Sequence, residues 1–226
     1  MTETLIRFQD VDFSYAAGRP VLSGCSFALR AGQRIALKGP NGSGKTTLLH
    51  LIVGLLRPDA GRIEAFGEVR RREADFHEVR CRAGLLFQNP DDQLFCPTVA
   101  EDVAFGPLNL GTPRPQVRKI VADTLKRLGL AGYEHRVTYR LSGGEKRLVA
   151  LATVLAMEPE VLLLDEPASG LDPQATDRLV ETLAGLSHAM LVVSHDRPFL
   201  GRTTTGTLEL RDGKLAESSI GREKIP

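Results

Sequence analysis

The stretch Gly39-Pro40-Asn41-Gly42-Ser43-Gly44-Lys45-Thr46 decides the fold of this chain. It fits the pattern G-x-x-x-x-G-K-[ST], in which a glycine-rich loop presents backbone N–H groups to nucleotide phosphates. Lys45 supplies a mobile positive charge for the β- and γ-phosphates, and the Thr46 hydroxyl is a ligand suited to Mg²⁺. The loop therefore predicts a nucleotide site formed by Gly39, Asn41, Gly42, Ser43, Gly44, Lys45, Thr46 and the adjoining Thr47.

The residues on either side of this loop are those of a strand and a helix. Ile35-Ala36-Leu37 is an apolar run of the kind that forms a buried strand. After the loop, apolar residues recur with the spacing of a packed helix at Leu48, Leu49, Leu51, Ile52, Leu55 and Leu56. A glycine-rich turn can match the motif by accident. The flanking strand and helix favour a phosphate-binding loop, because the N-terminus of a helix attracts anions.

Length and composition limit the classes of protein to consider. A chain of 226 residues with 42% hydrophobic residues can bury a full core, as one domain with subdomains or at most two small domains. The net charge of +1 gives no electrostatic argument for nucleic acid as a partner. The longest apolar run, residues 48–56, is interrupted by His50 and is far shorter than the ~20 residues of a membrane span. The N-terminus lacks the features of a signal peptide, so we expect a cytoplasmic protein whose cysteines are reduced packing residues.

The rest of the chain alternates between predicted strands and predicted helices. Apolar runs bounded by turn residues indicate strands at residues 4–15, 21–29, 33–38, 61–66, 83–87, 161–164 and 190–193, and a hairpin at 208–215. Helical spacing and capping residues indicate helices near 99–105, 115–128, 142–157 and 173–186. Residues 68–82, rich in Arg and Glu, are typical of a solvated surface segment. The helices between residues 89 and 157 suggest a helical subdomain inserted into an α/β core.

Polar residues follow the ends of four predicted strands: Gly39, Gln88, the pair Asp165-Glu166, and His195. In open parallel α/β sheets, ligands bind outside the carboxyl ends of the strands, so we expect these residues to gather around the nucleotide. Thr46 and Asp165 can bind Mg²⁺ directly or through water, with Gln88 as a third ligand. Glu166 is placed to accept a proton from attacking water, and His195 to contact the γ-phosphate.

Each of these residues also has a simpler interpretation. A histidine at a strand end is more often a packing residue, and an Asp-Glu pair after a strand often caps a helix. Their coincidence with the phosphate loop favours the catalytic interpretation. Tyr15, which precedes a Gly-Arg-Pro turn, can pack against its neighbours or stack on adenine, and the sequence leaves both open.

Ser142-Gly143-Gly144 forms a second candidate anion site, because it is glycine-rich and begins a predicted helix. Its simpler interpretation is a serine N-cap. The first loop already holds the phosphates of this chain's own nucleotide. A second site of the same chemistry points to a nucleotide held by another copy, and hence to a dimer with nucleotide between the subunits.

Taken in order, these motifs resemble the ATP-binding subunits of ABC transporters along essentially the whole chain. The matching segments are Gly39–Thr46 as Walker A, Gln88 as the Q-loop, Leu141–Glu145 as the signature, Val161–Glu166 as Walker B, Ser169–Asp172 as the D-loop, His195 as the switch histidine and Tyr15 as the A-loop aromatic. The resemblance implies a single domain over residues 1–226 with an α/β P-loop NTPase core on a parallel sheet. It also implies an N-terminal antiparallel β subdomain and an inserted helical subdomain at about 89–157.

The same resemblance implies a head-to-tail dimer that encloses two ATP molecules with Mg²⁺. Ser142, Gly143 and Gly144 would then meet the γ-phosphate bound by the opposite subunit, and Asp172 would also belong to the ATP site. Glu166, His195 and Lys45 would be catalytic, with Glu166 as general base and Asp165 as the magnesium carboxylate. Ala168 and Glu145 depart from the Thr and Gln common in relatives. Whether the dimer is of like or unlike subunits, and whether it forms without nucleotide, stays open.

A narrower resemblance comes from Phe87-Gln88-Asn89-Pro90-Asp91-Asp92-Gln93-Leu94-Phe95 and Glu101-Asp102-Val103-Ala104-Phe105-Gly106-Pro107. These segments are similar to the ATPases of energy-coupling factor importers, which take up vitamins or metals such as cobalt and nickel. The resemblance implies a groove here for helices of a transmembrane coupling protein, which works with a membrane substrate-binding protein. It places the chain peripherally at the cytoplasmic face of the membrane. Local core packing is the alternative role for Phe87, Phe95 and Phe105.

Two other functions are consistent with the ATP-site motifs. One is a non-transport ABC ATPase in DNA repair, chromosome organisation or translation, but residues 89–140 hold neither a heptad run nor cysteine pairs. The other is a regulatory subunit that binds ATP without turnover. Such subunits often lose the catalytic Glu or the switch His, and this chain has Glu166 and His195.

Overall fold

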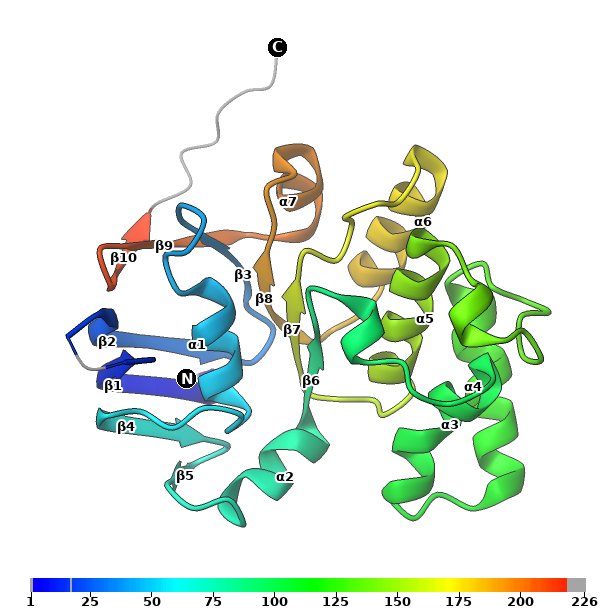
Figure 1. The fold of residues 1–226 in the computed structure, drawn as a ribbon, viewed down its shortest axis with the longest axis horizontal. Coiled ribbons are helices and arrows are strands. Elements are labelled where there is room, and N and C mark those ends of the chain that lie inside the picture. Colours follow the sequence, from blue (N-terminus) through cyan, green and yellow to red (C-terminus); the bar gives the residue numbers. More distant parts are fainter. Residues whose placement is uncertain (1, 17, 219–226) are drawn as a thin grey trace.

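Two β-sheets lie on either side of helix α1 (Lys45–Ile52) in the computed structural model, which describes residues 2–16 and 18–218 (Figure 1). The first sheet is antiparallel, with the order β2-β1-β4-β5. Its strands are β1 (Thr4–Ser14), β2 (Pro20–Arg30), β4 (Ala60–Ala65) and β5 (Glu68–Arg70). This N-terminal antiparallel sheet was expected, and the α/β fold class is confirmed.

The second sheet has the order β10-β9-β3-β8-β7-β6, and all its neighbouring strands are parallel except β9 and β10. Its strands are β3 (Arg34–Lys38), β6 (Ala83–Leu86), β7 (Val161–Asp165), β8 (Ala189–Val193), β9 (Gly206–Arg211) and β10 (Lys214–Ser218). The pair β9-β10 is the hairpin predicted around Asp212-Gly213. The parallel sheet predicted around the phosphate loop is therefore present.

The parallel sheet is buried on both faces. Successive side chains of a strand point to opposite faces, and in β7 Leu163 belongs to the core shared with α1 and the antiparallel sheet. Its neighbours Leu162 and Leu164 belong to a second core, formed with helices. β8 repeats the division, with Leu191 on the first side and Met190 and Val192 on the second. This two-sided burial explains why these strands are continuous apolar runs.

The second core is formed largely by the helices that follow β6 and β7 (Figure 1). Between those strands come α3 (Val99–Asn109), α4 (Arg114–Arg127) and α5 (Gly143–Leu155), with short 3₁₀ turns η1 (Pro90–Asp92) and η2 (Thr138–Arg140). After β7 come α6 (Pro173–Ala184) and α7 (Arg197–Thr203). No helix in the described ranges is long and apolar enough to cross a membrane.

Helix α1 is shorter than the sequence pattern indicates. The predicted helix extends to Leu56, but α1 ends at Ile52. Gly54 adopts a φ of 73°, and Leu55 N donates to the His50 carbonyl at 3.0 Å, which closes the helix in the manner typical of a C-terminal glycine. Leu55 is 49% exposed rather than packed. A Cβ at Gly54 would lie 2.2 Å from the Phe76 ring, so a neighbouring element helps to fix this end.

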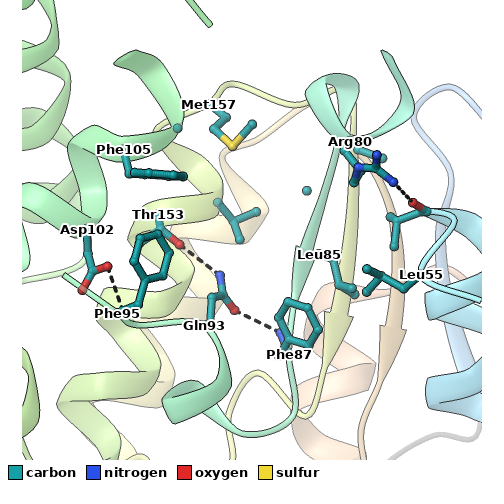
Figure 2. Close-up of a pocket in the computed structure, with 15 residues that line it drawn as sticks. Leu55, Arg80, Leu85, Phe87, Gln93, Phe95, Asp102, Phe105, Thr153 and Met157 are labelled. Carbon is teal, nitrogen blue, oxygen red and sulfur yellow. Dashed lines mark hydrogen bonds between the residues drawn. The ribbon is translucent and has the colours of Figure 1, made fainter. Parts of the chain in front are cut away.

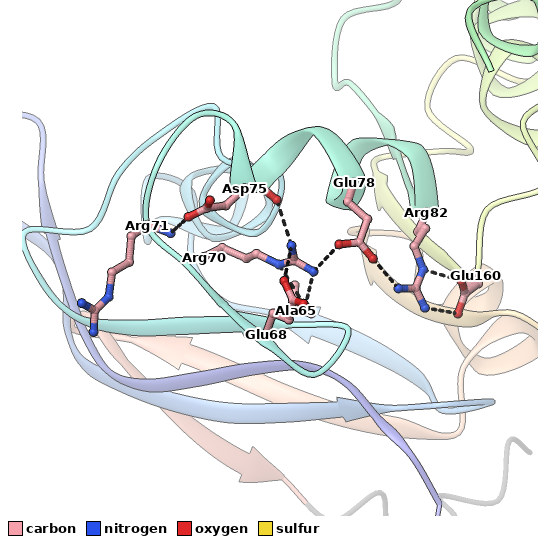
Figure 3. Close-up of polar contacts among 8 residues, drawn as sticks. All are labelled: Ala65, Glu68, Arg70, Arg71, Asp75, Glu78, Arg82 and Glu160. Atoms are coloured by element: carbon pink, nitrogen blue, oxygen red, sulfur yellow. Dashed lines mark hydrogen bonds and ion pairs between the residues drawn. The ribbon is translucent and has the colours of Figure 1, made fainter. Parts of the chain in front are cut away.

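The prediction that residues 68–82 form a solvated surface segment holds for most of the segment, which is largely exposed, but not for Arg70. The segment contains β5 and helix α2 (Asp75–Arg82), and Arg70 is only 5% exposed (Figure 3). The Arg70 guanidinium donates twice to the Ala65 carbonyl, at 3.0 and 3.1 Å, and once to Glu78 at 2.7 Å. The charge-rich composition does not indicate this burial, because an arginine can be buried when its donors are satisfied.

Replacing Arg70 with Met is expected to lower the free energy of unfolding by about 2 kcal/mol, because the buried Ala65 carbonyl loses its donor and Glu78 loses its ion pair. Urea denaturation measures this change. The control is Arg71→Met, at the adjacent exposed position, where the change should stay within about 0.5 kcal/mol. Equal stability of both variants and the wild type would contradict a structural role for the Arg70 contacts.

Two further findings concern helix α7 and the three cysteines. Helix α7 was not predicted, although Asp196 caps it by accepting from Phe199 N at 2.9 Å and Pro198 lies in its first turn. Cys25, Cys81 and Cys96 are free, as expected of packing residues, and the Cys25 thiol donates to the Gly213 carbonyl at 3.0 Å.

Candidate functional site

The register of the parallel sheet brings the predicted site residues to one edge. Leu86, Leu164, Val192 and Ala36 are paired in a row across β6, β7, β8 and β3. The chain leaves each strand within a few residues of this row. Gln88, Asp165-Glu166, His195 and the loop beginning at Gly39 therefore follow strand ends at the same edge.

The phosphate loop runs from β3 to the start of α1 and is tightly fitted to the sheet. Gly39 has a φ of 153°, and a Cβ there would lie 2.3 Å from the Leu210 carbonyl oxygen of β9. Any side chain at this position would collide with the neighbouring strand. Ser43 Oγ is buried and, among the described residues, has no hydrogen-bond partner. This unsatisfied group marks the loop as a place where a polar ligand belongs.

Lys45 occupies the inside of the loop. Its Nζ donates to the carbonyl oxygens of Gly39 and Pro40 at 2.9 and 2.8 Å, and the residue is 8% exposed. Burial lowers the pKa of the Lys45 ammonium, while the negative charges of Asp165 and Glu166 act in the opposite direction. The carbonyl partners are neutral, so an anionic phosphate is a stronger partner for this ammonium.

Thr46 and Asp165 form the predicted oxygen pair for a divalent cation. Thr46 Oγ1 donates to Asp165 Oδ2 at 2.6 Å, across 119 residues of sequence. Asp165 ends β7 and is 3% exposed, and this burial raises the pKa of its carboxyl group. The hydrogen bond from Thr46 and the nearby charges of His50, Lys45 and Arg147 work against that rise. A hydroxyl and a carboxylate beside a phosphate loop are the ligand types that Mg²⁺ takes, so these residues fit the ion.

Glu166 and His195 lie in contact. Glu166 has a φ of 52°, in the left-handed region, and its N–H donates to the Val193 carbonyl at 2.8 Å. Its carboxylate accepts from Ser194 Oγ at 3.3 Å and from His195 N at 3.4 Å, and His195 Nε2 lies 3.6 Å from Oε1. Strained backbone held in place by neighbours is typical of functional positions. The carboxylate is therefore held by two residues that follow the end of the neighbouring strand, β8.

Gln88 and Tyr15 lie at the borders of this site. Gln88 is exposed and lies two residues past the end of β6. In the sheet, β6 borders β7 on one side and β8 borders it on the other. The Tyr15 hydroxyl lies 2.9 Å from Thr47 Oγ1, while its ring is 65% exposed and contacts Phe13 edge-on at 5.0 Å between centroids. Tyr15 is thus anchored to α1 by its hydroxyl with most of its ring in solvent, an arrangement that favours stacking on a base over packing in the core.

The second candidate anion site lies at the start of α5. Ser142, Gly143 and Gly144 begin α5 and line an open pocket of about 860 Å³ together with Asp172, and no residue of the Gly39–Thr46 loop lines it. Ser142 forms a capping box with Glu145, so the N-cap interpretation holds as well. Asp172 caps α6 by accepting from Ala175 N at 2.8 Å.

Three residues near the site were missed from the sequence. Ser194 is buried and donates to the Glu166 carboxylate. His50, on α1, faces the Phe87 ring at 5.7 Å between centroids, and burial lowers the pKa of its imidazole. Arg147 is buried, and its Nη1 donates to the Phe87 carbonyl at 3.0 Å. Arg147 lies one turn after Gly143 on the buried face of α5, a position from which its role could have been suspected.

An apolar groove lies beside the Gln88 segment, and Phe87 and Gln93 of that segment help to line it. Its volume is about 230 Å³, and it is lined mainly by the side chains of Leu55, Leu85, Phe87, Phe95, Phe105 and Met157 (Figure 2). The rings of Phe95 and Phe105 meet edge-on at 4.8 Å between centroids, yet they are 67% and 46% exposed. The alternative that Phe95 and Phe105 are core residues is therefore wrong, and Phe87 is half-buried.

Comparison with known proteins identifies the family to which the chain belongs. A family model described as ABC transporter matches residues 22–169. The energy-coupling factor transporter ATP-binding protein EcfA of Methanothermobacter thermautotrophicus is 43% identical, over 93% of this chain and 69% of that protein. The nickel import ATP-binding protein NikO of Rhodobacter capsulatus is 46% identical, over 96% of this chain and 89% of that protein. The solved structure of cbiO1 from Clostridium perfringens, part of the ABC transporter complex cbiONQ, matches with a TM-score of 0.83 and 32% identity, over 95% of this chain and 87% of that one.

Proposed function

We propose that this chain, which belongs to the ABC transporter family and is an ATP-hydrolysing subunit, powers an energy-coupling factor type importer. The observation that carries the proposal is the apolar groove with two exposed phenylalanines beside the Gln88 segment. It lies where a membrane partner would act on the ATP site. The similarity to EcfA, NikO and cbiO1 supports the same class of importer.

ATP binding rests on the loop and α1. The backbone N–H groups of Gly39–Thr46 and the Lys45 ammonium would hold the β- and γ-phosphates, with Thr47 and the Ser43 hydroxyl adjoining them. Tyr15 would stack on adenine, which its exposed ring allows. Thr46 and Asp165, with Gln88 as a third ligand, would hold Mg²⁺, which when bound neutralises charge on the phosphates.

Hydrolysis requires a base for the attacking water, and Glu166 is the residue we assign. Its carboxylate is oriented by Ser194 and the backbone of His195. Proton acceptance at a fixed carboxylate contributes typically 10²–10⁴-fold to a rate. The exposed His195 side chain lies 3.6 Å from Glu166. It would contact the nucleotide on its γ-phosphate side, so that the end of the neighbouring strand responds when the γ-phosphate is present.

The separation of the two anion sites supports a head-to-tail dimer. No residue of the Lys45 loop lines the pocket of Ser142, Gly143 and Gly144, which supports separate phosphate contacts for the two segments within one chain. In a two-fold arrangement, each copy would offer them to the γ-phosphate held by the other. ATP would close such a dimer because it contacts both halves only in the closed state.

The cargo would be selected by a membrane substrate-binding protein, while a transmembrane coupling protein would place apolar helices in the groove. Nickel is favoured over vitamins by the similarity to NikO, a nickel import ATP-binding protein. The chain would then work peripherally at the cytoplasmic face of the membrane. The alternative, a non-transport ABC ATPase in DNA repair or translation, is not favoured by the relatives found.

A charge placed in the groove is expected to prevent assembly with the membrane partners without affecting the ATP site. In Phe95→Asp, a carboxylate would have to leave water to meet an apolar partner helix. A tagged subunit isolated from host membranes in mild detergent should recover a polytopic membrane protein and a small membrane substrate-binding protein, and Phe95→Asp should lose both. The affinity of purified Phe95→Asp for ATP should equal that of the wild type.

The matched control is Val69→Asp, which charges an exposed apolar residue of β5 outside the groove and should retain both partners. Recovery of DNA-repair or ribosomal proteins by the wild type would argue against an importer. Weaker ATP binding by Phe95→Asp would mean that Phe95 supports the fold of the site instead of a partner.

A further inference from the structure

Gln93 uses both ends of its side-chain amide to join two parts of the structure (Figure 2). Its Oε1 accepts from Phe87 N at 3.1 Å. Its Nε2 donates to the Ala150 carbonyl at 3.0 Å and to Thr153 Oγ1 at 2.9 Å, both on α5. A side chain on the border of an apolar groove thus connects the residue before Gln88 to the helix that begins with the second anion site.

Phe87 is held at both of its backbone polar groups by side chains linked to α5. Its N–H donates to Gln93, which is bonded to α5, and its carbonyl accepts from Arg147 of α5 at 3.0 Å. A further contact, an ion pair of 2.6 Å between Lys146 and Asp91, holds the turn that follows Gln88. Gln88 itself is exposed, so its position is set by these neighbours instead of by its own packing.

The shape of the segment explains why glutamine suits position 93. Gln93 follows η1, and its N–H donates to the Pro90 carbonyl at 3.1 Å, which turns the chain so that its side chain points back to Phe87. The amide must accept at one end and donate at the other. Among side chains of this length, only an uncharged amide does both. Glu matches the shape but has no donor for Ala150, and Met has neither function.

We propose that Gln93 is a positioning residue that fixes Gln88 for ATP hydrolysis and makes the Gln88 segment move as one unit with α5. The proposal rests on the role assigned to Gln88 under the proposed function. It extends that function by naming the link between the groove, which Gln93 helps to line, and the two anion sites. A partner that displaces Gln93 in the groove would shift Gln88 and Ser142 together.

The test compares Gln88→Ala, Gln93→Met and the double variant in the purified chain. We expect Gln93→Met to lower kcat for ATP by about tenfold with KM within about twofold, since misplacement of a group costs rate more than binding. In the Gln88→Ala background, Gln93→Met should lower kcat no further, because it acts through Gln88. Hydrogen exchange at the Phe87 amide should become about fivefold faster in Gln93→Met, whatever the activity.

Gln116→Met is the matched control, since it makes the same substitution at an exposed position of α4 outside the groove and should keep kcat and Phe87 exchange at wild-type values. If Gln93→Met does not fold, Gln93→Glu carries the same comparison, because it keeps the acceptor for Phe87 and loses the donor for α5. The test is then whether Gln93→Glu lowers kcat in the wild-type background but not in the Gln88→Ala background.

The outcomes separate the two proposals. A wild-type kcat in Gln93→Met, or a loss that adds fully to that of Gln88→Ala, would overturn the role of Gln93 while leaving the ATP-site assignments intact. A wild-type kcat in Gln88→Ala would remove the role of Gln88, and the role of Gln93 with it. The proposal is supported if Gln93→Met lowers kcat in the wild-type background but not in the Gln88→Ala background, and if the Phe87 amide exchanges faster.

Discussion

Replacing Glu166 with Gln is expected to lower kcat for ATP hydrolysis by about 10³-fold, while ATP affinity stays within about threefold of the wild type. The amide keeps the shape of the side chain and can still accept from Ser194 and from the His195 backbone, but it cannot take a proton from water. Phosphate release measures the rate, and equilibrium dialysis with labelled ATP measures the affinity. Light scattering should detect a dimer that persists with ATP, because closure is no longer relieved by hydrolysis.

Glu160→Gln is the control for this variant. Glu160 precedes the opposite end of the same strand, β7, where it pairs with Arg82 at 2.6 Å on the surface, and its loss should leave hydrolysis unchanged. Normal turnover by Glu166→Gln would remove Glu166 as the general base. Loss of ATP binding in that variant would instead mean that the carboxylate shapes the phosphate site.

Gly143→Asp is expected to abolish ATP-dependent dimerisation and to lower hydrolysis by about 10²-fold or more, without loss of folded protein. A Cβ at Gly143 meets no atom of the described residues within 4 Å, so the fold accommodates the side chain. A carboxylate in the first turn of α5 also interacts favourably with the helix dipole, so the melting temperature should stay equal or rise. The same charge would repel the γ-phosphate presented by a second copy.

Gly143→Ala separates charge from bulk in this experiment. Alanine adds the same Cβ without the charge, so it should retain most of the hydrolysis and the dimerisation seen by light scattering with ATP. Monomeric Gly143→Asp should still bind ATP, because its own phosphate loop lies in a different part of the chain. Full activity of Gly143→Asp would show that the start of α5 does not meet a phosphate.

The residues predicted from the sequence are those whose position depends on local structure. Thr46 follows a recognisable loop, and Asp165 and His195 follow apolar strands, so the sheet topology alone brings them to one edge. The short bond between Thr46 and Asp165 connects residues 119 apart, yet each was placed by its own strand end. Local patterns therefore carried both the fold class and most of the candidate site.

The misses concern tertiary contacts that no local pattern records. The charge-rich segment around Arg70 looked solvated, but Arg70 is buried because Ala65 and Glu78 accept its donors. The end of α1 depends on Gly54 and on the Phe76 ring beside it. Arg147 and Gln93 each reach a partner about 60 residues away, and α7 is only 7 residues long, too short for a helical repeat to stand out.

The central claim is that one ATP site is completed by two copies of the chain, and a mixing experiment tests it most directly. Lys45→Ala removes the phosphate lysine, Gly143→Asp blocks the start of α5, and each variant alone should be nearly inactive. In an equimolar mixture each mixed dimer has one intact site of two, so activity should return to at least about a quarter of the wild-type rate, the value for random pairing. A mixture as inactive as its components would contradict the account, and would mean that each chain hydrolyses ATP with its own residues alone.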